Sequence, residues 1–131
     1  MLNRIEAEDA KLSPGYEIEE RPETSNGKVA RLRNQSVGTV RYKFDFTPGE
    51  YELYVRYLDE IDGVGTSVIN INEQKVAEWK WQDAAASDVF LYRSFGTFNF
   101  EKNDDIEMWT LRDNGEYARV DYFEFVQVFD R

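Results

Sequence analysis

The chain has 131 residues, which is enough for a single domain with a sizeable core. It contains neither cysteine nor histidine, which excludes disulfides, thiol catalysis and cysteine-ligated zinc and removes the commonest general base. A net charge of -10 argues against nucleic acid as a partner, and no apolar run approaches the roughly 20 residues that a membrane span needs. Any bound metal should have oxygen ligands, which favours calcium.

Nearly all of the chain is predicted to be strand and turn. The clearest pattern lies at 38–46, where apolar side chains occupy every second position, as in a half-buried antiparallel strand. The least regular stretch, 83–92, is interpreted as a loop. Strands are expected at 4–8, 16–20, 28–33, 38–46, 51–57, 66–72, 75–81, 94–100, 106–111 and 117–129. About ten short strands at regular spacing, without helices, predict an all-β sandwich of antiparallel strands.

Two charged residues interrupt the apolar pattern of the last strand. Arg119 and Asp121 lie two residues apart, so both side chains are expected on one face, which Phe123 and Phe125 continue. A carboxylate in line with core aromatic rings needs a partner, because an unpaired buried charge is costly. We expect that partner at the other end of the chain, in the segment 6–8.

The two ends of the chain resemble the signatures of carbohydrate-binding modules of the family 6 and family 35 type. They read Ile5-Glu6-Ala7-Glu8-Asp9 and Arg119-Val120-Asp121-Tyr122-Phe123. Between them, Lys28-Val29-Ala30, Gly38-Thr39-Val40-Arg41-Tyr42 and Pro48-Gly49-Glu50-Tyr51-Glu52-Leu53 match in type and order. The resemblance covers essentially the whole chain and depends on the order and spacing of these segments rather than on one motif.

This resemblance implies a fold, a role and a location. Such modules are jelly-roll β-sandwiches with a structural calcium, appended to secreted glycan-degrading enzymes. Residues 1–131 would then form one non-catalytic module of a larger extracellular or cell-surface protein, covalently linked to a catalytic domain. The expected partner is a polysaccharide or oligosaccharide, with no role for nucleic acid or membrane.

The calcium implied by the resemblance has three candidate ligands. Glu6 and Glu8 are expected on one strand at i and i+2, so their carboxylates face one way, and Asp121 joins them from the last strand. Calcium takes roughly 6–8 oxygen ligands, so backbone carbonyls, plausibly from 26–28, should complete the shell. The alternative is an ordinary acidic surface strand; spacing alone favours this alternative, whereas the resemblance favours calcium.

The resemblance also places a sugar-binding cleft among loops at one edge of the sandwich. There a residue just before the last-strand aspartate, often asparagine, binds the sugar, whereas this chain carries Arg119 two residues before Asp121. The guanidinium fork of arginine matches a carboxylate or sulfate, which suggests an acidic glycan. The alternative is that Arg119 pairs with Glu116 or another neighbouring carboxylate.

An aromatic platform is the other expected part of the binding site. Trp79 and Trp81 are i and i+2 ahead of the irregular loop and are the first candidates, with Tyr117 next, whereas Trp109 is expected in the core. The alternative for any of these rings is core packing. Further candidate sugar contacts are Asp59, Glu60, Asp62, Asn114 and Glu116. For the acidic run at 59–62 a solvated turn is the default interpretation, and contacts to a sugar or a second calcium are the alternatives.

Two other function classes remain open at this point. One is a small polysaccharide-active enzyme that uses two carboxylates, but among 26 acidic residues a pair can always be nominated. The other is an adhesion sandwich that binds protein through a large exposed apolar patch. The leading interpretation is a module that binds an extracellular polysaccharide, with a uronate or sulfated glycan suggested by Arg119.

Overall fold

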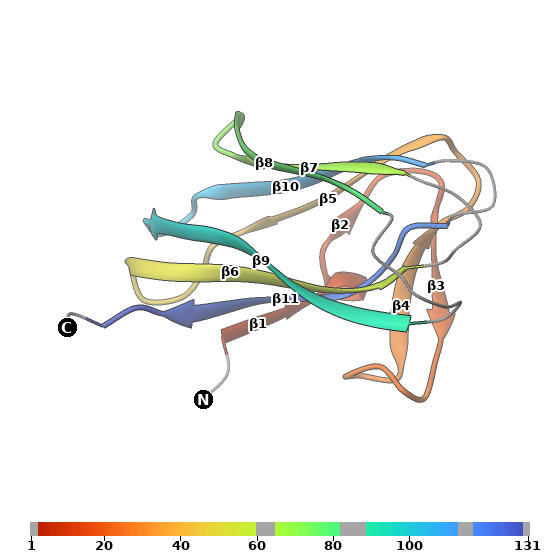
Figure 1. Cartoon of the computed structure of the whole chain (residues 1–131), viewed down its shortest axis with the longest axis horizontal. Helices are drawn as coiled ribbons and strands as arrows, with labels where there is room; N and C mark the ends of the chain where they lie inside the picture. The colour runs from red at the N-terminus through yellow and green to blue at the C-terminus, as the bar shows by residue number, and fades with distance from the viewer. Residues whose placement is uncertain (1–2, 60–64, 82–88, 113–116, 130–131) are drawn as a thin grey trace.

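The computed structural model describes residues 3–59, 65–81, 89–112 and 117–129, which form two antiparallel sheets packed face to face (Figure 1). The six-stranded sheet contains β1 (Asn3–Glu6), β3 (Tyr16–Glu20), β4 (Lys28–Leu32), β6 (Gly49–Asp59), β9 (Val89–Phe100) and β11 (Arg119–Gln127). The five-stranded sheet contains β2 (Lys11–Leu12), β5 (Val37–Lys43), β7 (Thr66–Ile71), β8 (Gln74–Lys80) and β10 (Asp105–Leu111). The predicted sandwich is confirmed.

The strand orders place the first and last strands of the chain side by side. The orders are β3-β4-β11-β6-β9, with β1 pairing with β11, and β2-β5-β10-β7-β8. The register of β1 on β11 runs from Asn3 opposite Phe125 to Glu6 opposite Tyr122. Asp121 of β11 is therefore brought next to the residues that follow β1.

Two differences between the observed and the predicted elements bear on the candidate sites. The first strand ends at Glu6, and the 3-10 helix η1 (Ala7–Asp9) follows, so it does not continue to residue 8 as expected. Strand β9 begins at Val89, inside the stretch that was interpreted as a loop. No helix in the described part of the chain is long and apolar enough to span a membrane.

The core lies between the sheets and is rich in aromatic rings. Phe44 and Phe100 stack with ring centroids 4.9 Å apart, and Phe125 meets Phe100 edge-on at 5.2 Å. All three rings are at most 2% exposed. Burying each of them contributes roughly 1.5–3 kcal/mol, and this apolar contact between the two sheets holds the sandwich together.

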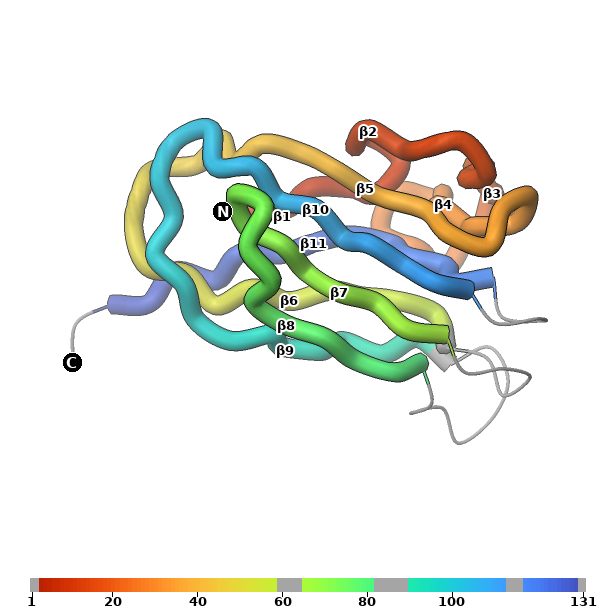
Figure 2. The backbone as a smooth tube through the Cα atoms, turned by 90° about the horizontal axis from the view of Figure 1, so that it is seen from above, coloured from red at the N-terminus to blue at the C-terminus, as the bar shows by residue number. Residues whose placement is uncertain are grey.

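The ends of six strands lie together at one end of the sandwich. The C-terminal ends of β6, β8 and β10 lie beside the N-terminal ends of β7, β9 and β11 (Figure 2). The described ends of these six strands therefore lie together at one end of the molecule.

Candidate functional site

The three predicted metal ligands meet at the corner where the segment before β4 approaches both ends of the chain. The backbone N–H of Ser25 donates to the Asp121 carboxylate at 3.3 and 3.4 Å, and the Ser25 hydroxyl donates to Glu6 Oε1. The Asn26 amide donates to Glu8 Oε2 at 3.0 Å. Residues 25 and 26 thus connect carboxylates from opposite ends of the sequence.

The arrangement of these carboxylates differs from the sequence-based expectation. Glu6 and Glu8 do not share a strand, because Glu8 lies in η1. Asp121 is buried and accepts a hydrogen bond from the Arg56 guanidinium as well as from Ser25. The described residues contain no group of three acidic side chains in an arrangement that could hold a metal ion.

Two observations nevertheless fit a cation at this corner. Glu8 Oε1 is buried and has no hydrogen-bond partner in the described structure, so one hard anionic donor is unsatisfied. Burial raises the pKa of Glu6, and the negative charges of Glu8 and Asp121 raise it further, against the hydrogen bond from Ser25. Burial also raises the pKa of Asp121, although its bonds to Arg56 and Ser25 oppose the shift. Carboxylate oxygens are the type of donor that calcium prefers.

Arg119 is engaged by a carboxylate of the protein itself. Its side chain is buried and donates to Glu19 of β3 through Nε at 2.7 Å and through Nη2 at 3.4 Å. Glu19 also accepts bonds from Arg21 and Arg31. Burial would raise the pKa of Glu19, but the hydrogen bonds from Arg119 and Arg21 outweigh it and lower the pKa. The Arg119 guanidinium, which was expected to bind a carboxylate of the ligand, thus binds Glu19 instead. This is the alternative in which Arg119 pairs with a neighbouring carboxylate.

Trp79 and Trp81 lie in the core and not on the surface. They are 3% and 0% exposed, and the Trp81 ring meets Tyr57 edge-on at 4.7 Å. The Trp81 indole N–H donates to the Ser67 hydroxyl at 2.7 Å, and Ser67 in turn shares a hydrogen bond with Thr110. The expectation that this pair forms a sugar platform is wrong, because a buried ring offers no face to a sugar.

The other aromatic candidates are only partly exposed. Trp109 is half-buried on the outer face of the five-stranded sheet, between Thr39 and Val68, and does not belong to the core as expected. Tyr117 is half-buried, and the guanidinium groups of two arginines lie 5.4 Å from its ring centroid. The candidates Glu60, Asp62, Asn114 and Glu116 and the side chain of Asp59 lie outside the described residues.

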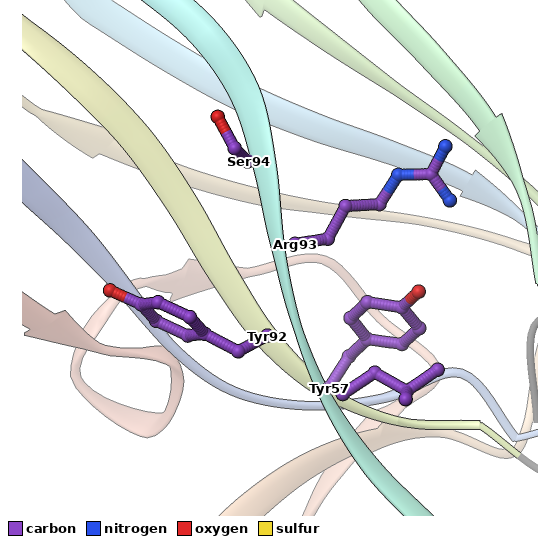
Figure 3. A pocket seen from close by; sticks show the side chains of 5 residues that line it. Tyr57, Tyr92, Arg93 and Ser94 are labelled. Carbon is purple, nitrogen blue, oxygen red and sulfur yellow. The ribbon is translucent and has the colours of Figure 1, made fainter.

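An open cavity of about 370 Å³ lies at β9, the edge strand of the six-stranded sheet (Figure 3). Arg93 of β9 and the ring of Tyr57 from β6 lie on one side of the strand, whereas Tyr92 and Ser94 point to the other side. Leu91 packs against the core and gives the cavity an apolar wall. Tyr57 is only 1% exposed, so the lining that a ligand could reach is the Arg93 guanidinium beside the apolar side chain of Leu91.

Arg93 is not among the sequence-based candidates, because it falls between the predicted loop at 83–92 and the predicted strand at 94–100. The signal was present, since Leu91 and Phe95 flank Arg93 at every second position and both pack against the core. A charged residue in an inward-facing series, close to the end of a strand, indicates a polar group that lines a cavity rather than a solvated face.

The curated relatives of the chain are much longer enzymes. The chain is 33% identical over 133 residues to a probable alpha-glucuronidase A of Aspergillus oryzae, covering 91% of this chain and 16% of that protein. It is 28% identical over 96 residues to an alpha-glucuronidase of Hypocrea jecorina, covering 73% of this chain and 11% of that protein. The chain thus spans a sixth or less of these relatives. No protein-family model matches it.

Solved structures show the same fold over almost the whole chain. A family 35 carbohydrate-binding module from Clostridium thermocellum superimposes with a TM-score of 0.78 at 16% identity, covering 98% of this chain and 99% of that one. A family 6 module from Clostridium stercorarium in complex with cellobiose superimposes with a TM-score of 0.72 at 18% identity, covering 96% of this chain and 94% of that one. The chain therefore has the jelly-roll β-sandwich fold of family 35 and family 6 carbohydrate-binding modules, as its sequence resemblance indicated.

Proposed function

We propose that residues 1–131 form a non-catalytic carbohydrate-binding module that holds a larger glycan-degrading enzyme on an extracellular polysaccharide. The observation that carries this proposal is the match to an isolated family 35 module, which leaves almost none of either chain uncovered. The match to only 16% of an alpha-glucuronidase supports an ancillary domain that is covalently linked to a catalytic one.

We further propose that the ligand carries uronate groups and that Arg93 takes the place that the sequence suggested for Arg119. The names of the curated relatives, alpha-glucuronidases, favour a glycan that contains glucuronic acid. Arg93 lines an open cavity together with Tyr57 and Leu91, whereas Arg119 is buried against Glu19. Arginine binds a carboxylate through paired hydrogen bonds, while the apolar wall suits the ring of the sugar.

The net charge of -10 opposes an anionic polymer at long range. Screening over about 8 Å at physiological salt limits this repulsion, so the local attraction of one guanidinium can dominate at contact distance. The cavity is at the edge of the six-stranded sheet, where β9 has a neighbour on one side only, and a polymer can reach it without unfolding any strand pair.

We also propose that calcium binds at the corner formed by Glu6, Glu8 and Asp121. The unsatisfied Glu8 oxygen, and the burial and negative neighbours that raise the pKa of Glu6, support this proposal. Bound calcium would supply positive charge beside Glu6 and Glu8, in addition to that of Arg56 at Asp121, and carbonyls of the segment at 25–28 are the candidates to complete its shell. Its role would be structural, because the corner joins the two ends of the chain.

The function is tested by titrating the protein with glucuronoxylan and with the same polymer after reduction of its carboxyl groups. The native glycan should bind, and Arg93→Ala should weaken it about tenfold or more, since a hydrogen bond to a charged group is worth roughly 1.5–3 kcal/mol. The affinity of Arg93→Lys, which keeps the charge but not the paired donors of the guanidinium, should lie between those of the unmodified protein and Arg93→Ala. Arg33→Ala removes an exposed arginine of another region and serves as the matched control.

Three outcomes would contradict different parts of the proposal. Equal binding of the native and reduced polymers, unaffected by Arg93→Ala, would refute the uronate ligand. Absence of binding to any glycan of a broad array would refute the binding module. Release of new reducing ends from the polymer, at a rate proportional to protein concentration, would refute a non-catalytic role.

A further inference from the structure

The outer face of the six-stranded sheet carries several tyrosines, of which only Tyr92 also lines the proposed cavity. Tyr122, Arg56 and Tyr92 lie opposite one another on β11, β6 and β9. The next outward row contains Glu124, Tyr54 and Ser94 on the same three strands. Alternation along the strands places these side chains on the face that points away from the core.

The Tyr92 ring is both exposed and held in place. It stacks on Tyr54 with centroids 4.5 Å apart and 3° between the ring planes, and its centroid is 6.4 Å from that of Tyr122. Tyr92 is still 47% exposed, whereas Tyr54 is half-buried and Tyr122 is 8% exposed. A ring fixed by its neighbours loses little conformational freedom when a ligand packs against it, so the face is organised before binding.

Polar groups surround this ring in pairs that leave little net charge. The Tyr92 hydroxyl donates to Glu124 Oε1 at 2.7 Å, and Glu124 forms an ion pair with Arg4 at 3.6 Å. The Arg4 guanidinium lies 3.8 Å from the Tyr122 ring centroid, and its buried Nε has no hydrogen-bond partner within the described chain. The face therefore combines an exposed aromatic ring with hydrogen-bonding groups and favours neither sign of charge.

We propose that this tyrosine face, defined by Tyr54, Tyr92, Tyr122 and Glu124, is a second binding surface that takes neutral sugar residues of the polysaccharide. The C–H face of a pyranose ring packs on the exposed part of Tyr92, and its hydroxyl groups bond with Glu124 and Ser94. This inference rests on the proposed function and extends it, since the cavity binds the acidic side group and this face binds the uncharged chain.

Continuity with the cavity identifies the occupant as the same glycan. Tyr92 and Ser94 line the cavity rim on the opposite side of β9 from Arg93, so a polymer that leaves the cavity crosses the edge strand onto this face (Figure 3). A protein partner is less suited, because a stable interface needs a broad apolar centre, whereas the exposed ring of Tyr92 bonds through its hydroxyl to Glu124, which is itself paired with Arg4.

The test uses xylohexaose, a neutral oligosaccharide, with two variants and a control. Tyr92→Ala should weaken its binding about tenfold, while Tyr92→Phe, which keeps the stack on Tyr54, should retain most of it. Phe129→Ala removes an aromatic ring that is 72% exposed outside the face and should change nothing. Unchanged melting temperatures establish that the variants are folded.

Backbone amide shifts of the unmodified protein provide a second readout. On titration with xylohexaose, the amides of Tyr54, Tyr92, Tyr122 and Glu124 should shift, and that of Trp109 on the opposite sheet should not. Unmoved amides on this face, unchanged affinity in Tyr92→Ala, or self-association that depends on Tyr92 would each overturn the second surface. If glucuronoxylan still binds through Arg93 in that case, only this inference fails; if no glycan binds, the proposed function fails with it.

Discussion

Removal of calcium should lower the stability of the protein by an amount that can be calculated. A ligand at 100 times its dissociation constant stabilises the native state by about 2.7 kcal/mol if it binds only that state. Unfolding entropy is roughly 2.1 cal/mol/K per residue, so for this chain the shift in melting temperature is about 10 °C. The measurement is thermal unfolding, followed by circular dichroism, in calcium and in excess EDTA.

Glu8→Gln is the most informative variant at the proposed calcium corner. Without calcium it should unfold at the same or a slightly higher temperature, because Glu8 Oε1 has no partner to lose and the charge of Glu8 repels Glu6. With calcium it should lose most of the stabilisation, since one anionic ligand is gone. Asp121→Ala should also abolish the response but start from a lower temperature, because Arg56 loses its buried partner.

The control and the refuting result follow from the same reasoning. Glu20→Gln removes an exposed carboxylate of β3 and should leave the calcium response intact. A melting curve that EDTA does not change would refute the calcium site. A full response in Glu8→Gln would show that calcium binds elsewhere on this acidic chain.

Three further predictions concern charge and packing. The metal-free protein should lose stability as pH rises from about 4.5 through the raised pKa of Glu6, because the folded state binds more protons than the unfolded state in that window. Chemical denaturation measures this slope, and Glu8→Gln should flatten it. A stability of the metal-free protein that rises over the same pH range would contradict the prediction. Glu19→Gln should lower the free energy of unfolding by about 3 kcal/mol, because it leaves the buried Arg119 without a full counter-charge. Arg21→Ala, which removes a more exposed partner of Glu19, should lower it by under about 1 kcal/mol. Equal losses in the two variants would refute the assigned burial. Trp81→Phe should destabilise by about 2 kcal/mol with unchanged glycan affinity, and the opposite pattern would restore Trp81 to the binding site.

The fold could be predicted because the strands carry a clear alternating pattern. In β5, Val40 and Tyr42 face the core while Arg41 and Lys43 are exposed, as the period of two requires. The same pattern states which residues share a face but not whether that face points inward. Trp79 and Trp81 were correctly placed together, yet their face turned out to be the core because the opposite sheet covers it.

The candidate site was harder to predict because a register shift breaks the alternation of β11. The pairing with β6 shifts between Val120 and Tyr122, and both Val120 and Phe123 pack in the core although they are three residues apart. Arg119 therefore does not share the core-facing side of Phe123, and its partner is Glu19 on a strand a hundred residues away in sequence. No local pattern in the sequence identifies such a shift or such a partner.

Arg56 links the proposed calcium corner to the tyrosine face. Its guanidinium bonds to Asp121, and on the sheet it lies directly opposite Tyr122 on one side and Tyr92 on the other. It also lies 4.2 Å from the ring centroid of Phe90, so its position is fixed by packing as well as by charge. A cation bound at Asp121 would weaken the attraction between Asp121 and Arg56. Arg56 lies beside Tyr92, which is the most exposed ring of the tyrosine face. We therefore expect calcium binding at the chain ends and glycan binding on the tyrosine face to be coupled through Arg56.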